Sequence, residues 1–217
     1  MASAKRARRL QIMGAAVLAV VLVAVVVVVA GAGGGGGGSG NGAHAAAADS
    51  GAPIPKPGPL AVAGKLSQAA AAAGCVSKTF PSEGRTHTTG SVTYHTNPPT
   101  SGNHNPTPAE DGIYDPGNTP AKENYVHTLE HGRIELQYRP GTSKHVIAEL
   151  TSLFNEPLNG TPGYHMLLFE NNTNMPYAVA ATAWTHLLGC PRMNNKVFDA
   201  VRAFRAAYTD KAPELIP

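Results

Sequence analysis

The chain has few charged side chains, and it has no basic surplus in the region expected to fold. Charged residues make up only 14% of the 217 residues. Residues 1–64 hold five basic side chains and one acidic side chain, and residues 65–217 hold 12 basic and 13 acidic ones, so the net charge of +3 divides into +4 and −1. The folded part therefore lacks the electrostatic footprint of a nucleic-acid-binding protein, and we expect no nucleic-acid partner.

Cysteine is equally scarce, because the chain has only Cys75 and Cys190 and no Cys-x-x-Cys pair. Two cysteines near opposite ends of an exported domain favour a disulfide, since the compartment outside the cytoplasm is oxidising. A soft metal ligand or a redox thiol is the alternative. The sequence also has no G-x-S-x-G nucleophile elbow, and Ser101 close to His104 does not by itself predict a serine hydrolase, because triads assemble in space.

The long stretch without charge, residues 10–30, follows four basic side chains in residues 1–9. Its 21 residues would span about 30 Å as a helix, which is the thickness of a bilayer core. The basic flank predicts a cytoplasmic tail, residues 1–9, a single transmembrane helix and an extracytoplasmic domain. We therefore expect a single-pass protein of the cell membrane. A cleaved signal peptide is the alternative, since Ala30-Gly31-Ala32 resembles a cleavage site, but the apolar stretch is long for one.

Residues 31–64 are rich in glycine, alanine and proline, which predicts a disordered linker before a globular domain, residues 65–217. The expected fold class of this domain is α+β, a small mixed β-sheet with helices packed on it. Periodicity and capping residues predict helices over 65–73, 119–131, 143–154 and 197–208, and strands over 92–95, 133–138, 165–169 and 177–184.

Three of these strands carry specific expectations. Strands 133–138 and 165–169 should be parallel through a right-handed crossover, and 165–169 should form a hairpin with 177–184. Strand 133–138 alternates apolar and polar residues, so we expect it to be half-buried.

The densest group of potential ligands is His127-x-x-Glu130-His131, at the end of the second predicted helix. Histidines four residues apart share a helix face, and neutral imidazole is a common metal ligand. The pattern matches H-x-x-E-H zinc peptidases, but their further carboxylate ligand has few counterparts here, and the domain is short for that architecture. The alternative without a metal is a pair of histidines that cap the helix and interact with its dipole. The late carboxylates are Asp199, Asp210 and Glu214.

Several motifs together resemble the domain of unknown function 3105 family, over roughly residues 75–217. They are Tyr94-x-x-Asn97-Pro98-Pro99-Thr100-Ser101-Gly102-x-His104, Gly112-x-Tyr114, His127-x-Leu129-Glu130-His131-Gly132, Ala183-Trp184, Cys190 and Ala212-Pro213-Glu214. The resemblance implies that His104, His127, Glu130 and His131 belong to one signature, with His87 as a further member. It also implies a bacterial protein with an N-terminal membrane segment, and it brings no established activity.

We therefore expect a membrane-tethered extracytoplasmic domain that binds zinc or copper through His104, His127, His131 and Glu130, with His87 as a further candidate ligand. A metal-dependent hydrolase of the cell envelope, in which Glu130 activates a metal-bound water, is the first alternative. The second is a non-catalytic envelope module, whose histidines and prolines line a groove for a protein or glycan partner.

Overall fold

The computed structural model describes residues 51–216. The predicted cytoplasmic tail, the predicted transmembrane helix and the first part of the predicted linker lie outside these residues. Within 51–216, no helix has the length and apolar character needed to cross a membrane. The elements in chain order are η1 (Ala63–Lys65), α1 (Leu66–Ala73), β1 (Val76–Thr79), β2 (Gly112–Ile113), α2 (Lys122–Glu130), β3 (Ile134–Tyr138), α3 (Lys144–Phe154), β4 (Met166–Glu170), β5 (Val179–Ala183), β6 (His186–Cys190) and α4 (Val197–Tyr208).

The six strands form one mixed sheet in the order β1-β6-β5-β3-β4-β2. Strands β3 and β4 are parallel and are joined by α3, as predicted for a crossover connection. The predicted hairpin between 165–169 and 177–184 is wrong. β5 pairs antiparallel with β3 and with β6 instead, and β4 has β3 and the short β2 as its neighbours.

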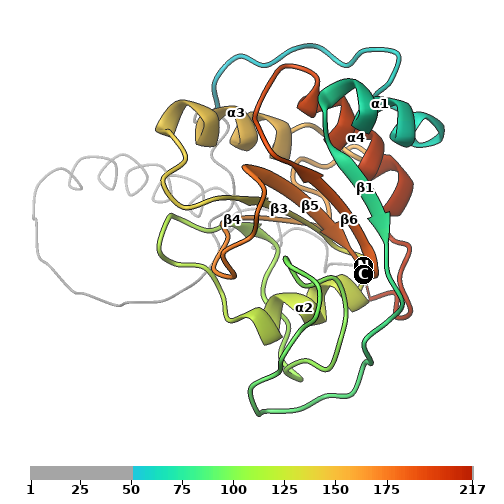
Figure 1. The fold of residues 1–217 in the computed structure, drawn as a ribbon, viewed down its shortest axis with the longest axis vertical. Coiled ribbons are helices and arrows are strands. Elements are labelled where there is room, and N and C mark those ends of the chain that lie inside the picture. The colour runs from blue at the N-terminus through green and yellow to red at the C-terminus, as the bar shows by residue number, and fades with distance from the viewer. Residues whose placement is uncertain (1–50, 217) are drawn as a thin grey trace, which may run out of the picture. The chain divides into compact units, whose positions relative to one another are not determined.

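Helices cover both faces of the sheet, with α1, α3 and α4 on one face and α2 on the other (Figure 1). The alternation along β4 follows these two layers: Met166 and Leu168 belong to the larger core, and Leu167 and Phe169 belong to a smaller core under α2. α2 contributes three fully buried apolar side chains to this smaller core, Tyr125, Val126 and Leu129.

Strand β3 is fully buried rather than half-buried, which corrects the expectation from its sequence. Its apolar residues enter the larger core, and its polar residues Glu135 and Gln137 are also 0% exposed. Glu135 accepts hydrogen bonds from Thr182 Oγ1 at 2.7 Å and from Gln137 Nε2 at 2.9 Å. Alternation predicts which residues share a face, but it cannot show that a helix and loops cover the polar face as well.

The predicted disulfide is present between Cys75 and Cys190. It joins the start of β1 to the end of β6, two antiparallel neighbours, and β1 was not among the predicted strands. Residues 92–95, predicted to be a strand, have no regular structure. Helix α1 ends as predicted at Gly74, which adopts the left-handed conformation of a C-cap with φ 70°.

The described part of the predicted linker lies against the domain. The backbone N–H of Ala52 donates to the carbonyl of Ala148 in α3, and the N–H of Gly58 donates to the Asp199 carboxylate in α4. Arg202 donates from its guanidinium to the Pro55 carbonyl at 2.6 Å. Composition predicted this segment to be disordered because it has few apolar residues, whereas two of those few, Ile54 and Leu60, pack against the larger core.

Candidate metal centre

Helix α2 supplies two of the polar side chains of the site, His127 and Glu130. The helix packs on the sheet through its apolar side, where Tyr125 stacks on Phe169 with ring centroids 4.9 Å apart. His127 and Glu130, one turn apart, are each only 3% exposed, because the proline-rich loop and the C-terminal segment cover this side of the helix. The polar face predicted from the sequence is therefore a buried face.

The proline-rich loop, residues 97–106, brings His104 to α2. Backbone hydrogen bonds hold it on both sides, from Thr185 N to the Thr100 carbonyl and from Asn105 N to the Glu123 carbonyl. Gly102 lies in the turn at φ 128°, where an added Cβ would come within 2.8 Å of the Tyr94 ring. A glycine is therefore required at this turn. The result is that His104 is fully buried, with 0% exposure.

His87 reaches the site through backbone pairing with His104. The N–H of Thr88 donates to the His104 carbonyl at 2.7 Å, and the N–H of His104 donates to the Thr86 carbonyl at 3.2 Å. These two bonds form an isolated parallel bridge. Unlike the other members of the site, His87 is exposed to solvent.

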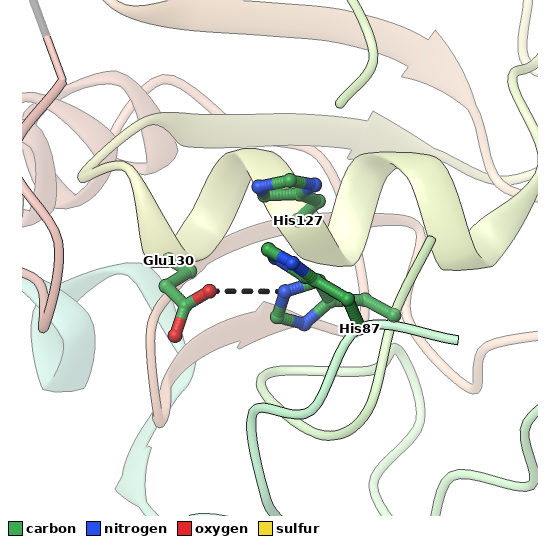
Figure 2. A group of neighbouring side chains, drawn as sticks. His87, His127 and Glu130 are labelled. Atoms are coloured by element: carbon green, nitrogen blue, oxygen red, sulfur yellow. Dashed lines mark ion pairs between the residues drawn. The ribbon is translucent and has the colours of Figure 1, made fainter. Parts of the chain in front are cut away.

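One ligand atom from each of four residues lies within 4.8 Å of the others: His87, His104, His127 and Glu130. The three imidazole centroids are 4.6 to 5.0 Å apart. Figure 2 shows His127 and His87 close together beside Glu130, and its dashed line marks the pair between Glu130 and His104. A tetrahedral zinc site with bonds of about 2.0–2.1 Å places ligands about 3.3 Å apart, so an ion would draw this group closer together.

Backbone carbonyls fix the tautomers of the two buried imidazoles. His104 Nδ1 lies 2.8 Å from the Gly102 carbonyl oxygen, and His127 Nδ1 lies 2.6 Å from the Asn105 carbonyl oxygen. A carbonyl can only accept, so each Nδ1 carries the proton and donates it. In the neutral rings, both Nε2 atoms then carry a free lone pair. Histidines that bind metals are held by this kind of hydrogen bond to the second nitrogen.

His104 Nε2 is buried and faces Glu130, yet it has no hydrogen-bond partner among the described residues. The Nε2 and Oε2 atoms are 3.0 Å apart, but their angles do not satisfy a hydrogen bond. Both atoms are acceptors when the imidazole is neutral and the carboxylate is ionised, so their approach is unfavourable without a positive charge between them. A cation that binds both atoms would satisfy them.

Burial disfavours the charged forms of the three buried side chains. It lowers the pKa of His104 and of His127, although each backbone hydrogen bond opposes the shift. Burial also raises the pKa of Glu130, and the neighbouring Glu214 carboxylate adds to this effect. Neutral imidazoles are the form that binds metals, so the two histidines already have the protonation state of ligands at neutral pH.

His131, predicted to be a ligand, lies beside this group rather than in it. It is the C-cap residue of α2, and its ring is 4.4 Å from that of His127. Its Nε2 atom is 3.9 Å from Glu214 Oε2. Burial, followed by the effect of His127, lowers the pKa of His131 to about 4. The structure thus groups the ligand atom of His87, and not that of His131, with those of His104, His127 and Glu130.

The remaining histidines of the described chain have other partners. His95 pairs with Glu83, His145 with Glu149 and His165 with Asp210, and His186 stacks on Tyr208.

Two charged residues that the sequence did not place at the site lie at its open side. A pocket of about 360 Å³ is lined by Arg85, His87, Glu130, Pro213 and Glu214. Glu214 belongs to the C-terminal segment, and its backbone N–H donates to the Glu130 carbonyl at 3.1 Å. The family motif that contains Glu214 indicated a place for this residue near the site. For Arg85 the only sequence signal was its position two residues before His87.

Gly132 allows the C-terminal segment to reach α2. It has φ +82°, and an added Cβ would lie 2.9 Å from the Asp210 Cα atom. The N–H of Asp210 donates to the Gly132 carbonyl at 3.0 Å. The glycine that ends the histidine motif is thus explained by a close backbone approach, in addition to its left-handed conformation.

Comparison with known proteins gives one match. The family model described as "Protein of unknown function (DUF3105)" matches residues 86–215. Searches of the curated proteins and of the solved structures give no match. The family match contains His87, His104, His127 and Glu130, together with the C-terminal residues that adjoin them. By this match over more than half of its length, the chain belongs to the DUF3105 family.

Proposed function

We propose that this protein is a membrane-tethered extracytoplasmic domain that binds a transition metal ion through His87, His104, His127 and Glu130. The observation that carries the proposal is the pair of buried imidazoles whose Nδ1 atoms are held by backbone carbonyls. The ligand atoms of these two imidazoles and of Glu130 lie within 4.8 Å of one another. A pair of helix-capping histidines would not account for the loop histidine His104 in this group.

The donor set favours zinc or divalent copper. Three imidazoles and one carboxylate suit either ion, and zinc sites are commonly four-coordinate with such ligands. Monovalent copper favours sulfur ligands. Both cysteines form the disulfide, and the four-residue group supplies only nitrogen and oxygen atoms.

The membrane location is supported by the sequence. The uncharged residues 10–30 follow a basic flank, which favours an N-terminus in the cytoplasm and a domain outside it. The disulfide between Cys75 and Cys190 also suits an oxidising compartment.

Metal analysis of the 217-residue chain, purified in detergent without a histidine tag, tests the proposal. We expect about one zinc or copper ion per chain after loading and dialysis, and a higher melting temperature with the ion than without it. A His104→Gln, His127→Gln variant should lose both effects. His145→Gln is the matched control, because His145 is exposed and, within residues 51–216, pairs with Glu149 alone. A wild-type chain that retains no ion and shows no shift with either metal would rule the proposal out.

A metal-dependent hydrolase is a second candidate, favoured by one observation. Glu130 lines a pocket that is open to solvent, so a water molecule on a bound ion would lie near a carboxylate able to accept its proton. In that case Glu130 acts on water and is not needed to hold the ion. Replacement of Glu130 by glutamine separates the two candidates, as set out in the Discussion.

A further inference from the structure

Three of the four side chains of the candidate metal centre are buried, and the fourth is exposed. His104, His127 and Glu130 are 0 to 3% exposed, whereas His87 is exposed. His87 and Glu130 both line the 360 Å³ pocket. An ion held by the four side chains would therefore meet solvent, or a ligand, on the side of this pocket. Its volume is within the range of small-molecule sites, about 300–1,000 Å³.

Arg85 is the positively charged side chain of this pocket. It is exposed, and it forms no ion pair or side-chain hydrogen bond with any other residue in 51–216. Arg133, by comparison, pairs with Asp111 at 3.3 Å. Burial raises the pKa of Glu130 and the charge of Arg85 acts against that shift, but the guanidinium donates no hydrogen bond to this carboxylate. Its N–H groups are therefore available to bind an anion through two parallel hydrogen bonds.

A bound ion reverses the charge of the pocket. Without an ion, ionised Glu130 and Glu214 outweigh Arg85, and the net charge is −1. A divalent cation changes this to +1, because the three imidazoles are neutral. A single negative charge in the pocket would then be balanced by Arg85 and the ion together, and the metal-free pocket would repel the same anion.

We propose that the metal-loaded site binds a carboxylate-bearing ligand in the pocket, with one end of the carboxylate on the ion and the other on Arg85. This inference rests on the proposed metal binding and adds the chemical class of the ligand. Zinc sites can expand from four to five ligands, so one carboxylate oxygen can join the four protein ligands on the ion. Glu214 lines the same pocket and opposes the ligand through its negative charge.

The test measures the binding of N-acetylalanine to the 217-residue chain in detergent by calorimetry. Its amide, which differs only in the lost carboxylate, is the comparison ligand. We expect N-acetylalanine to bind the zinc-loaded chain, and we expect no binding of the amide or to the metal-free chain. Arg85→Met should weaken binding by about tenfold or more, the usual effect of losing a hydrogen bond between charged groups, while the chain still binds zinc, because a positive charge near the ion has been removed.

Two further variants complete the design. Arg139→Met is the matched control, because Arg139 is exposed and follows the far end of β3, away from the pocket. It should bind N-acetylalanine as the wild type does. Glu214→Gln should bind it several-fold more tightly, since one opposing charge is removed.

The outcomes separate this inference from the metal proposal. If zinc binds but N-acetylalanine does not, or binds Arg85→Met as well as wild type, the carboxylate site is wrong and metal binding stands. Binding of inorganic phosphate in its place would also overturn the carboxylate assignment. If zinc itself does not bind, both proposals fail.

Discussion

His104 Nε2 and Glu130 Oε2 lie 3.0 Å apart in the interior of the protein, with no hydrogen bond between them. The backbone hydrogen bond at His104 Nδ1 places the proton on the other side of the ring, so the facing nitrogen presents its lone pair to the carboxylate. Buried polar atoms are rarely left in this state. A cation shared between the two groups would account for this relationship.

The two histidines of the backbone bridge should differ when they are replaced. His87→Ala should weaken metal binding but change stability by less than about 0.5 kcal/mol, because the side chain is exposed. His104→Ala should weaken metal binding and also destabilise the metal-free fold by about 2–4 kcal/mol, since it leaves a cavity and an unpaired Gly102 carbonyl. Urea unfolding in the presence of a chelator measures the stability of the metal-free fold. Zinc titration without the chelator measures the metal affinity. Equal stability losses would contradict the assigned burial.

Replacement of Glu130 by glutamine tests its role as a ligand. Glutamine keeps the size of the side chain and removes its charge, so zinc affinity should fall by at least about tenfold, since even the loss of supporting residues costs that much. Competition with a coloured chelator gives the affinity. Unchanged affinity would exclude Glu130 as a ligand and would favour the hydrolase candidate, in which this carboxylate acts on water.

Buried Glu135 should make stability depend on pH. Burial raises the pKa of its carboxyl well above the usual range, although Thr182, Thr128 and Gln137 oppose the shift by hydrogen bonding. The folded protein therefore holds this proton at pH values where the unfolded chain, with a pKa of about 4.3, has released it. This bound proton stabilises the folded state. Its contribution is fully present below the pKa that Glu135 has in the unfolded chain, and it is lost as the pH rises through the pKa that Glu135 has in the folded protein.

Glu135→Gln removes this dependence. Because glutamine is neutral at every pH, the variant should be more stable than wild type at pH 8, and the difference should shrink towards pH 4. Each unit of raised pKa corresponds to about 1.4 kcal/mol. Urea unfolding between pH 4 and pH 8 measures it. A difference that stays constant over this range would show that Glu135 does not titrate as described.

Alanine substitutions at Gly132 and Gly141 distinguish the stability cost of backbone strain from that of a steric clash. Both have φ near +80°, but an added Cβ meets the Asp210 backbone only at Gly132, and nothing lies within 4 Å at Gly141. Gly141→Ala should cost about 1–2 kcal/mol for its left-handed conformation. Gly132→Ala should cost about 1–3 kcal/mol more, because backbone atoms must move. Equal losses in urea unfolding would mean that the C-terminal segment does not pack here.

Local patterns predicted much of the fold. The apolar stripe and the capping residues predicted α4 and α1 to within a residue, because these signals are contained in the helices themselves. Strand partners were harder to predict. β5 was assigned to β4, its predecessor in sequence, but it pairs with β3. Which strand pairs with β5 depends on which faces of the sheet the helices cover, and short-range periodicity does not contain that information.

The site was predicted in part. Helical spacing identified His127 and Glu130 as neighbours on one face. The same spacing placed His131 with them, but His131 follows the last helical residue and its ring lies near Glu214. Only the family resemblance indicated that His87 belongs to the site. Its approach to the other three side chains depends on backbone pairing with His104, which local spacing does not predict. The residues around Arg85 in the sequence did not indicate that it lines a pocket together with Pro213 and Glu214 of the C-terminal segment.

X-ray absorption at the zinc edge of the loaded, untagged chain tests metal binding at this site most directly. The scattering pattern of imidazole distinguishes histidine ligands from oxygen and sulfur. The proposed site predicts three imidazoles, at least one oxygen ligand and no sulfur. A spectrum with sulfur in the coordination shell, or with fewer than two imidazoles, would contradict the assignment of the ion to His87, His104, His127 and Glu130.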